Sequence, residues 1–219
     1  MDTCDRRARV VLLSFLLAST SGACRSGDGA RPATGAERAP SNAVAAAEPR
    51  PAPTPAADAL RAARELVFPA QPGWERETPT SALRKAQFRL PRVAGDAEDA
   101  SLVVFHFGAG GGGGHEANLA RWAGQFEQPD GSDSRARLVS STREVAGLDV
   151  LDVALDGTYV AETAPGSGTR VRKEGWRMLA SIVASDHGAY YVKLVGPAAT
   201  VAHWEPSYRR STAEVRPGG

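Results

Sequence analysis

LVVFHFGAGGGGGHEANLARWAGQF (residues 102–126) joins two different periodicities through a run of glycine. Apolar side chains fill most positions from Leu102 to Phe107, as in a strand that is covered on both faces of a sheet. After the glycines, apolar residues recur at the spacing of one helix face, at Leu119, Trp122, Ala123 and Phe126. The stretch predicts a central strand, a glycine loop and a helix that covers the sheet.

The sequence on either side predicts that this strand belongs to a mostly antiparallel sheet. Further strand patterns fall at residues 86–90, 136–145, 148–160, 176–184 and 189–195. Turn residues at Ala146-Gly147 and at Ser185 to Gly188 predict two hairpins. Helices are expected at 59–65 and at 198–210, the second with Pro206 kinking or restarting it. The fold class is therefore α+β, with a central antiparallel sheet flanked by helices.

The N-terminus has the pattern of an export signal. A basic segment at residues 6–9 precedes an apolar run at 10–18 that is too short to span a bilayer stably. Small residues then lead to Cys24, as in bacterial lipoprotein signals, although Ser21 stands where those signals usually carry an aliphatic residue. We predict a signal peptide at 1–23, lipidation of Cys24, and a membrane-anchored protein in the periplasm or at the cell surface. Ordinary signal cleavage stays open as the alternative.

The remaining chain divides into a tether, a domain and a tail. Residues 25–57 are rich in Ala, Pro, Gly and charge, so they bury too little apolar surface to offset their ordering entropy. We predict a lipidated cysteine and disordered tether at 24–57, a single globular domain at 58–214, and a disordered tail at 215–219. Both cysteines of the chain precede the domain, which therefore has no disulfide and no thiol for catalysis or zinc.

The charge pattern argues against nucleic acid as a partner. Lys and Arg number 26 and Asp and Glu number 25, which gives a net charge of +1. No long basic run and no basic patch interleaved with aromatic residues is present. The expected partners are a membrane, through the lipid, and an envelope protein.

Three segments carry a family resemblance: residues 73–91 (GWERETPTSALRKAQFRLP), 102–131 (LVVFHFGAGGGGGHEANLARWAGQFEQPDG) and 175–197 (GWRMLASIVASDHGAYYVKLVGP). They resemble an uncharacterised family of exported bacterial proteins and lipoproteins, in which a GW…RKAQF segment precedes a glycine-rich loop and an NxxRWxxQF helix. The element order also resembles the PsbP/Mog1-like fold. The first resemblance implies no reaction, and the second implies an accessory or binding module.

The glycine run matches a nucleotide motif by spacing. Gly108, Gly110 and Gly113 satisfy G-x-G-x-x-G. A dinucleotide site also needs a parallel βαβ unit with an acidic residue about 20 residues further on, where this chain has the polar loop PDGSDS. A P-loop needs Gly-Lys-Ser/Thr, and here Gly114 precedes His115. We predict a flexible connection with few positions that require positive φ, no nucleotide and no cofactor.

Metal and carboxylate chemistry have weak candidates. His106, His115 and Glu116 are metal-ligand types, but the second histidine of H-E-x-x-H is missing, so no metal is predicted. Asp152 and Asp156 lie about 13 Å apart on one strand, too far to act on one bond, and are expected at the surface.

Serine and tryptophan residues give no clearer site. Ser81 and Ser181 lack the G-x-S-x-G elbow of hydrolases. Large aromatic side chains at these spacings are expected in the core rather than in a ligand cleft: Trp74, Trp122, Trp176 and Trp204.

The helix after the glycines offers the candidate partner or ligand surface, made of His115, Glu116, Asn118, Arg121 and Gln125. We predict a membrane-tethered, non-catalytic accessory or binding module of the cell envelope, whose biochemical activity the sequence does not reveal. The alternative is an exported hydrolase or small-ligand binder that uses the face beside the glycine loop. A deep cleft converging on these histidine and glutamate side chains and His106 would favour the alternative.

Overall fold

The computed structural model describes residues 55–63, 65–162 and 167–218, which belong to one compact unit. The predicted signal peptide, Cys24 and most of the predicted tether lie outside the described residues. None of the helices in the described part is long and apolar enough to cross a membrane.

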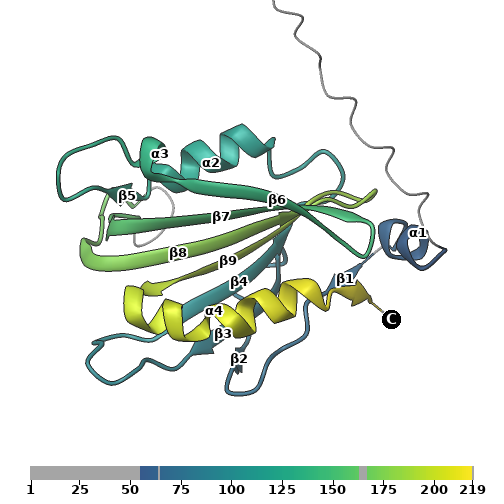
Figure 1. Cartoon of the computed structure of the whole chain (residues 1–219), viewed down its shortest axis with the longest axis horizontal. Helices are drawn as coiled ribbons and strands as arrows, with labels where there is room; N and C mark the ends of the chain where they lie inside the picture. Colours follow the sequence, from purple (N-terminus) through teal and green to yellow (C-terminus); the bar gives the residue numbers. More distant parts are fainter. Residues whose placement is uncertain (1–54, 64, 163–166, 219) are drawn as a thin grey trace, which may run out of the picture. The chain divides into compact units, whose positions relative to one another are not determined.

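An eight-stranded sheet forms the centre of the domain (Figure 1). Its strands are β2 (Glu75–Glu77), β3 (Arg84–Leu90), β4 (Ala100–His106), β5 (Phe126–Glu127), β6 (Val139–Val145), β7 (Leu148–Tyr159), β8 (Lys173–Val183) and β9 (Tyr190–Pro197). The order is β2-β3-β4-β9-β8-β7-β5, and β6 lies beside β5 along the same edge of β7. Every pairing in this sheet is antiparallel.

Four helices and a small strand pair complete the described domain. They are α1 (Pro55–Arg61), α2 (His115–Ala123), α3 (Ser134–Arg137), α4 (Ala198–Ala213), β1 (Leu66–Val67) and β10 (Arg216–Pro217). The predicted α+β class, a mostly antiparallel sheet flanked by helices, is confirmed.

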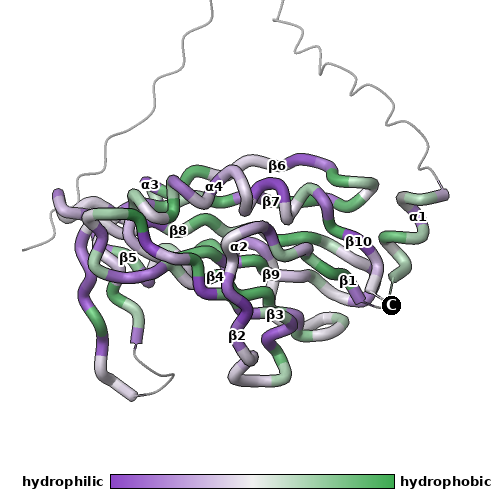
Figure 2. Tube along the Cα trace, turned by 90° about the horizontal axis from the view of Figure 1, so that it is seen from below, coloured by the Kyte–Doolittle hydropathy of each residue, from purple (hydrophilic) through white to green (hydrophobic). Residues whose placement is uncertain are grey.

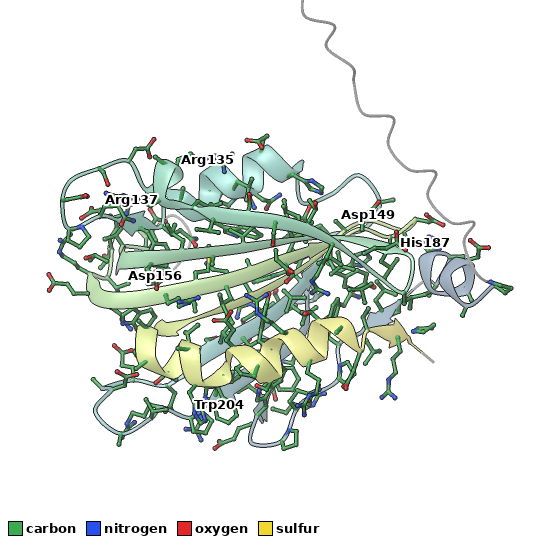
Figure 3. The ribbon with its side chains drawn as sticks, viewed as in Figure 1. Arg135, Arg137, Asp149, Asp156, His187 and Trp204 are labelled. Carbon is green, nitrogen blue, oxygen red and sulfur yellow. The ribbon has the colours of Figure 1, made fainter. Side chains whose placement is uncertain are left out.

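α4 covers one face of the sheet, here called the α4 face (yellow helix in Figure 1). Strand residues that alternate toward it form one core with Tyr208 of α4, among them Phe88, Leu90, Leu102, Leu179 and Leu194. Trp204 (Figure 3) projects from α4, and its indole N–H donates to the carbonyl of Pro91 at 2.8 Å. α4 runs through Pro206 without ending there.

α2 covers part of the opposite face, here called the α2 face. Leu119, Trp122 and Ala123 of the helix pack on alternate strand residues that include Val153, Leu155, Met178 and Ile182. Figure 2 shows the hydrophobic residues of β8, a strand that contributes to both cores. The predicted role of this helix as a sheet cover is confirmed.

The end of α2 differs from the sequence prediction. The helix ends at Ala123, where the N–H of Gly124 donates to the carbonyl of Ala120 at 3.0 Å. Phe126 continues the apolar pattern but lies in β5, paired with Tyr159, and its ring stays in the same core. A one-turn helix that the sequence did not reveal, α3, follows because Asp133 accepts a capping hydrogen bond from the N–H of Arg135.

Both chain ends of the domain also differ from prediction. The first helix spans residues 55–61 instead of 59–65. Residues 215–219 were expected to be disordered, whereas Val215 is buried and Arg216–Pro217 pairs with Leu66–Val67. Residues 215–218 are ordered because the β1 backbone, far away in the sequence, pairs with them.

The two predicted hairpins are confirmed. Ala146 and Gly147 have φ values of 48° and 86°, as a two-residue type I′ turn requires, and they join β6 to β7. Gly188, with φ 112°, closes the β8–β9 turn, where Ser185 Oγ donates to its carbonyl at 2.7 Å.

Asp152 contradicts the expectation of a surface position. It lies on the α4 face of β7, opposite to Val153 and Leu155, and it is only 8% exposed. Arg143 Nε pairs with it at 2.5 Å, and Ser181 Oγ donates to it at 2.5 Å while contacting the Tyr208 hydroxyl. The carboxylate is buried because α4 covers this part of β7. Asp156, four residues on, is exposed as expected (Figure 3).

Candidate functional site: an aromatic groove around Lys193

The α2 helix is too short to cover its face of the sheet. Its 9 residues span about 13 Å. Seven strand positions lie across the sheet, because β5 and β6 share one edge of β7. At a spacing of about 4.8 Å, the sheet is therefore ~29 Å wide. On the other face, the 16 residues of α4 and the β1–β10 pair share the cover. Part of the α2 face is therefore left open.

Two adjoining hollows occupy that open part. One, of about 220 Å³, lies beside α2 and is lined by Phe105, Phe107, Asn118, Arg121, Trp122, Gln125, Tyr191 and Lys193. The other, of about 380 Å³, lies on the strands and is lined by Arg84, Glu98, Asp99, Ser101, Val103, Phe105, Tyr159, Lys173, Trp176, Lys193 and Val195. Because Phe105 and Lys193 line both, we treat the two as one surface and call it the Lys193 groove.

A larger hollow of about 590 Å³ lies between the end of α2, β5 and α3. Its charged side chains already have structural partners. Arg135 (Figure 3) pairs with Glu116 of α2, Glu127 pairs with Arg172, and Asp133 caps α3. We therefore favour the Lys193 groove as the functional site, although each of its two hollows is smaller than this one.

Aromatic rings form the walls of the groove in fixed pairs. Phe105 and Phe107 stack with centroids 6.1 Å apart, and Phe107 meets Tyr191 edge to face at 5.6 Å. Tyr159 and Trp176 stack at 5.3 Å. Because neighbouring rings hold one another in place, a flat ligand would meet an apolar surface that needs little reordering.

Lys193 lies where the two hollows meet. Its Nζ donates to Gln125 Oε1 and lies 5.6 Å from the centroid of the Tyr159 ring. Burial among apolar groups lowers the pKa of its ammonium from 10.5 to about 8. None of the ion pairs formed within the described residues includes Lys193. Lys193 is therefore a cation at neutral pH with no carboxylate partner in that part of the chain.

Two arginines that line the groove also donate hydrogen bonds to side-chain amide oxygens. Arg84 Nη1 donates to Gln87 Oε1 at 2.8 Å, and its guanidinium lies 5.4 Å from the Phe105 centroid. Arg121 Nη1 donates to Asn118 Oδ1 at 3.0 Å. Like Lys193, each arginine is held by a neutral amide, which orients a cation without cancelling its charge.

The carboxylates at the rim of the groove are neutralised instead. Glu98 pairs with Lys173, whose Nζ also lies 4.6 Å from the Trp176 centroid. Asp99 accepts from Arg89 Nη1 at 2.7 Å, and this hydrogen bond is the main reason that the pKa of Asp99 is lowered. The charge left over in the groove is therefore positive.

The glycine loop is hydrogen-bonded to Asn118 and Tyr191, which line the groove. The expectation of a flexible connection is therefore wrong. Asn118 Nδ2 donates to the carbonyls of Gly112, Gly113 and Gly114 at 2.9–3.2 Å, and the Tyr191 hydroxyl donates to Gly113 at 2.9 Å. Positive φ values occur at Gly108, Gly110, Gly112 and Gly113. A Cβ on Gly112 would lie 2.6 Å from the Tyr191 side chain. Several of the glycines are therefore required, contrary to the prediction.

The structure brings together three of the five residues predicted as a surface. Asn118, Arg121 and Gln125 all line the Lys193 groove. Asn118 is buried rather than solvent-facing, and Gln125 lies just beyond the helix. His115 and Glu116 are exposed and lie outside the groove, His115 beside a separate hollow at β6 and β7.

The other sequence candidates do not converge on the groove. His106 stacks on Tyr190 at 4.2 Å, and its Nε2 donates to the carbonyl of His187. Ser181 is buried on the α4 face, and Ser81 is exposed. The tryptophans pack in or against the two cores as expected, yet Trp122 and Trp176 also line the groove.

Sequence reasoning missed the residue at the centre of the groove. Lys193 interrupts the apolar strand YYVKLV at a position that alternation places on the same face as Tyr191 and Val195. A charged residue in an otherwise apolar strand could have marked Lys193 as a candidate site residue. Arg84, Tyr159 and Trp176 gave no such signal, because they reach the groove from strands far apart in the sequence.

No protein-family model matches this chain, and no curated protein matches it. Among solved structures, the chain is similar to PA94, a Pseudomonas aeruginosa protein of unknown function. The likeness has a TM-score of 0.38 and 15% sequence identity, and it covers 61% of this chain and 82% of that chain. A likeness at this level assigns no function, so the groove is interpreted from its own chemistry.

Proposed function

We propose that this protein is a non-catalytic binding module that holds a small molecule in the Lys193 groove. The observation that carries the proposal is the open, aromatic-walled part of the α2 face with one unneutralised lysine at its centre. Ligand sites are typically concave, mainly apolar and supplied with a few placed polar groups. The hollow beside α2 has all three properties, and the hollow on the strands adds more polar groups. We therefore favour the small-ligand binder that the sequence analysis gave as an alternative over a module that binds only an envelope protein.

The chemistry of the groove favours binding over hydrolysis. Its polar side chains carry cations, amides and hydroxyls, and its two carboxylates are engaged by Lys173 and Arg89. Hydrolysis needs a nucleophile with a base in hydrogen-bond reach, or paired carboxylates free to exchange protons. Ser101 lines the groove, but none of the hydrogen bonds within the described residues joins its hydroxyl to a base.

The proposal includes the location predicted from the sequence. Residues 1–24 carry the pattern of an exported lipoprotein, so we propose a module tethered to a membrane through Cys24. The resemblance to exported bacterial proteins and to the PsbP/Mog1-like fold supports the same role. An envelope protein that receives or delivers the ligand is the partner this arrangement needs.

Filling the groove tests the proposal. The full chain, carrying Cys24→Ala so that no lipid is attached, is titrated with the neutral dye N-phenylnaphthylamine, which fluoresces in apolar sites. Ser101→Trp fills the hollow on the strands, and Ser140→Trp on exposed β6 is the matched control.

We expect saturable dye binding that Ser101→Trp weakens at least tenfold and Ser140→Trp leaves unchanged. Val195→Trp, a second filling variant from the neighbouring strand, should reproduce the loss. Equal thermal melting of the variants is the control for folding. Dye binding that survives both filling variants would place the site elsewhere and overturn the proposal.

A further inference from the structure

The bonding of the groove's cations narrows the ligand class. We propose that the Lys193 groove takes a small organic acid in which one anionic group is attached to a flat, apolar ring system. This inference rests on the proposed function. It follows from charge and shape together, since neither the cations nor the rings alone would select such a molecule.

The anionic group is inferred from the partners of the cations. Lys193, Arg84 and Arg121 each donate to an amide oxygen, of Gln125, Gln87 and Asn118 respectively. The surface cations Arg137 and Arg172, by contrast, each pair with a carboxylate. An amide fixes the position of a charged donor and leaves the charge free to attract an anion.

A single anionic group fits better than several. Among the described residues, Lys193 is the only cation that lines both hollows, and it is half-buried. Arg121 is exposed at one end of the groove, and Arg84 lies at the other. An acid group at Lys193 would replace the weak amide acceptor with a charged one, in surroundings where such a bond is strong.

The flat ring system is inferred from the walls. Phe105, Trp176 and Tyr191 come from three different strands and present ring surfaces to the hollows on both sides of Lys193. The hollow beside α2 has about 220 Å³, which suits a body of one or two fused rings. A flat ring system can stack on aromatic walls. A flexible chain binds less favourably, because it must also lose conformational entropy when it binds.

Four probes separate the parts of this inference: naphthoate, its neutral counterpart naphthylmethanol, the flexible acid decanoate, and acetate. Each is titrated by calorimetry into the full Cys24→Ala chain. We expect naphthoate to bind at least tenfold more tightly than any of the other three. Lys193→Met should remove that preference, Lys193→Arg should keep most of it, and Lys85→Met on the exposed face of β3 should leave it intact.

The outcomes distinguish this inference from the proposed function. If naphthylmethanol binds as tightly as naphthoate, the groove binds a ligand but does not select an anion, and the inference fails alone. If decanoate binds more tightly than naphthoate, the inference that the ligand carries a flat ring system is wrong. If naphthoate does not bind while the neutral dye does, the inference is also wrong. If neither binds in the groove, both proposals fail.

Discussion

Lys193 loses part of its hydration in the folded chain, and within the residues that the structure describes only Gln125 and the Tyr159 ring compensate for that loss. Burial lowers the pKa of its ammonium to about 8, which means that folding disfavours the charged form. A residue that destabilises the fold at neutral pH is unusual in a strand centre. A role in binding gives a reason for it, because binding sites often retain groups that stability alone would remove.

The first prediction follows at the residue scale. Replacing Lys193 with Met should raise the thermal midpoint by roughly 3–6 °C at pH 6.5, corresponding to about 1–2 kcal/mol. The folded pKa lies below the unfolded value of about 10.4, so the unfolded chain binds more protons between them and wild-type stability rises with pH in that window. The advantage of Lys193→Met should therefore shrink when melting is repeated at pH 9.5.

Lys85→Met is the control, since Lys85 is exposed and should change the midpoint little at either pH. A Lys193→Met chain that melts below the wild type at pH 6.5, or an advantage that grows with pH, would show that Lys193 contributes to stability through interactions we have not identified.

At the element scale, the segment from β4 through the glycine loop to α2 connects fold and site. Asn118, at the first full turn of α2, bonds three loop carbonyls and orients Arg121. Tyr191 of β9 bonds the same loop while its ring lines the groove. The glycines are therefore needed for a close approach of backbone to Tyr191 and not as a hinge.

The loop supplies the second prediction. Gly112→Ala places a Cβ at φ +82° and 2.6 Å from the Tyr191 side chain, so it should destabilise the fold by about 2–4 kcal/mol. Gly114→Ala is the matched control, because Gly114 has φ −72° and open space around its Cβ, and it should cost less than about 1 kcal/mol. Urea unfolding compares the two, and equal losses would mean that the loop does not pack on Tyr191.

Local periodicity accounts for the elements that the sequence predicted well. Alternation placed β3, β7 and β9, and the 3.6-residue period placed α2, because these patterns depend on near neighbours along the chain. The end of α2 was missed because Phe126 stays in the same core after the backbone changes from helix to strand. Asp152 was misplaced because its partners Arg143 and Ser181 come from neighbouring strands and α4 covers all three.

At the scale of the whole molecule, contacts between distant parts of the chain form both the site and the ends of the domain. The groove takes residues from β3, β4, β7, β8, β9 and α2, so no single motif could reveal it. The β10 strand pairs with β1, although the two strands lie near opposite ends of the domain's sequence. Next to this pair, the N–H of Gly218 donates to the carbonyl of Glu65 at 2.7 Å. Pairing of this kind depends on the complete fold and leaves little trace in local sequence.

The third prediction concerns those paired ends. Deleting residues 215–219 should destabilise the domain by about 2–3 kcal/mol, because it removes the buried side chain of Val215 and exposes the β1 backbone. Arg216→Ala keeps the backbone pairing and removes only an exposed side chain, so it should stay within about 0.5 kcal/mol. An unchanged melting curve after the deletion would mean that the tail contributes nothing to the fold, as the sequence alone suggested.

The four tryptophans supply the most direct test of the Lys193 groove. Trp122 and Trp176 line the groove, whereas Trp74 and Trp204 pack against the α4 face. Indole N–H signals of the full Cys24→Ala chain are recorded by ¹⁵N NMR during titration with naphthoate. We predict saturable shifts of the Trp122 and Trp176 signals and constant Trp74 and Trp204 signals, with the shifts lost in Lys193→Met. Shifts confined to Trp74 and Trp204, or no saturable shift of any indole signal, would contradict the account.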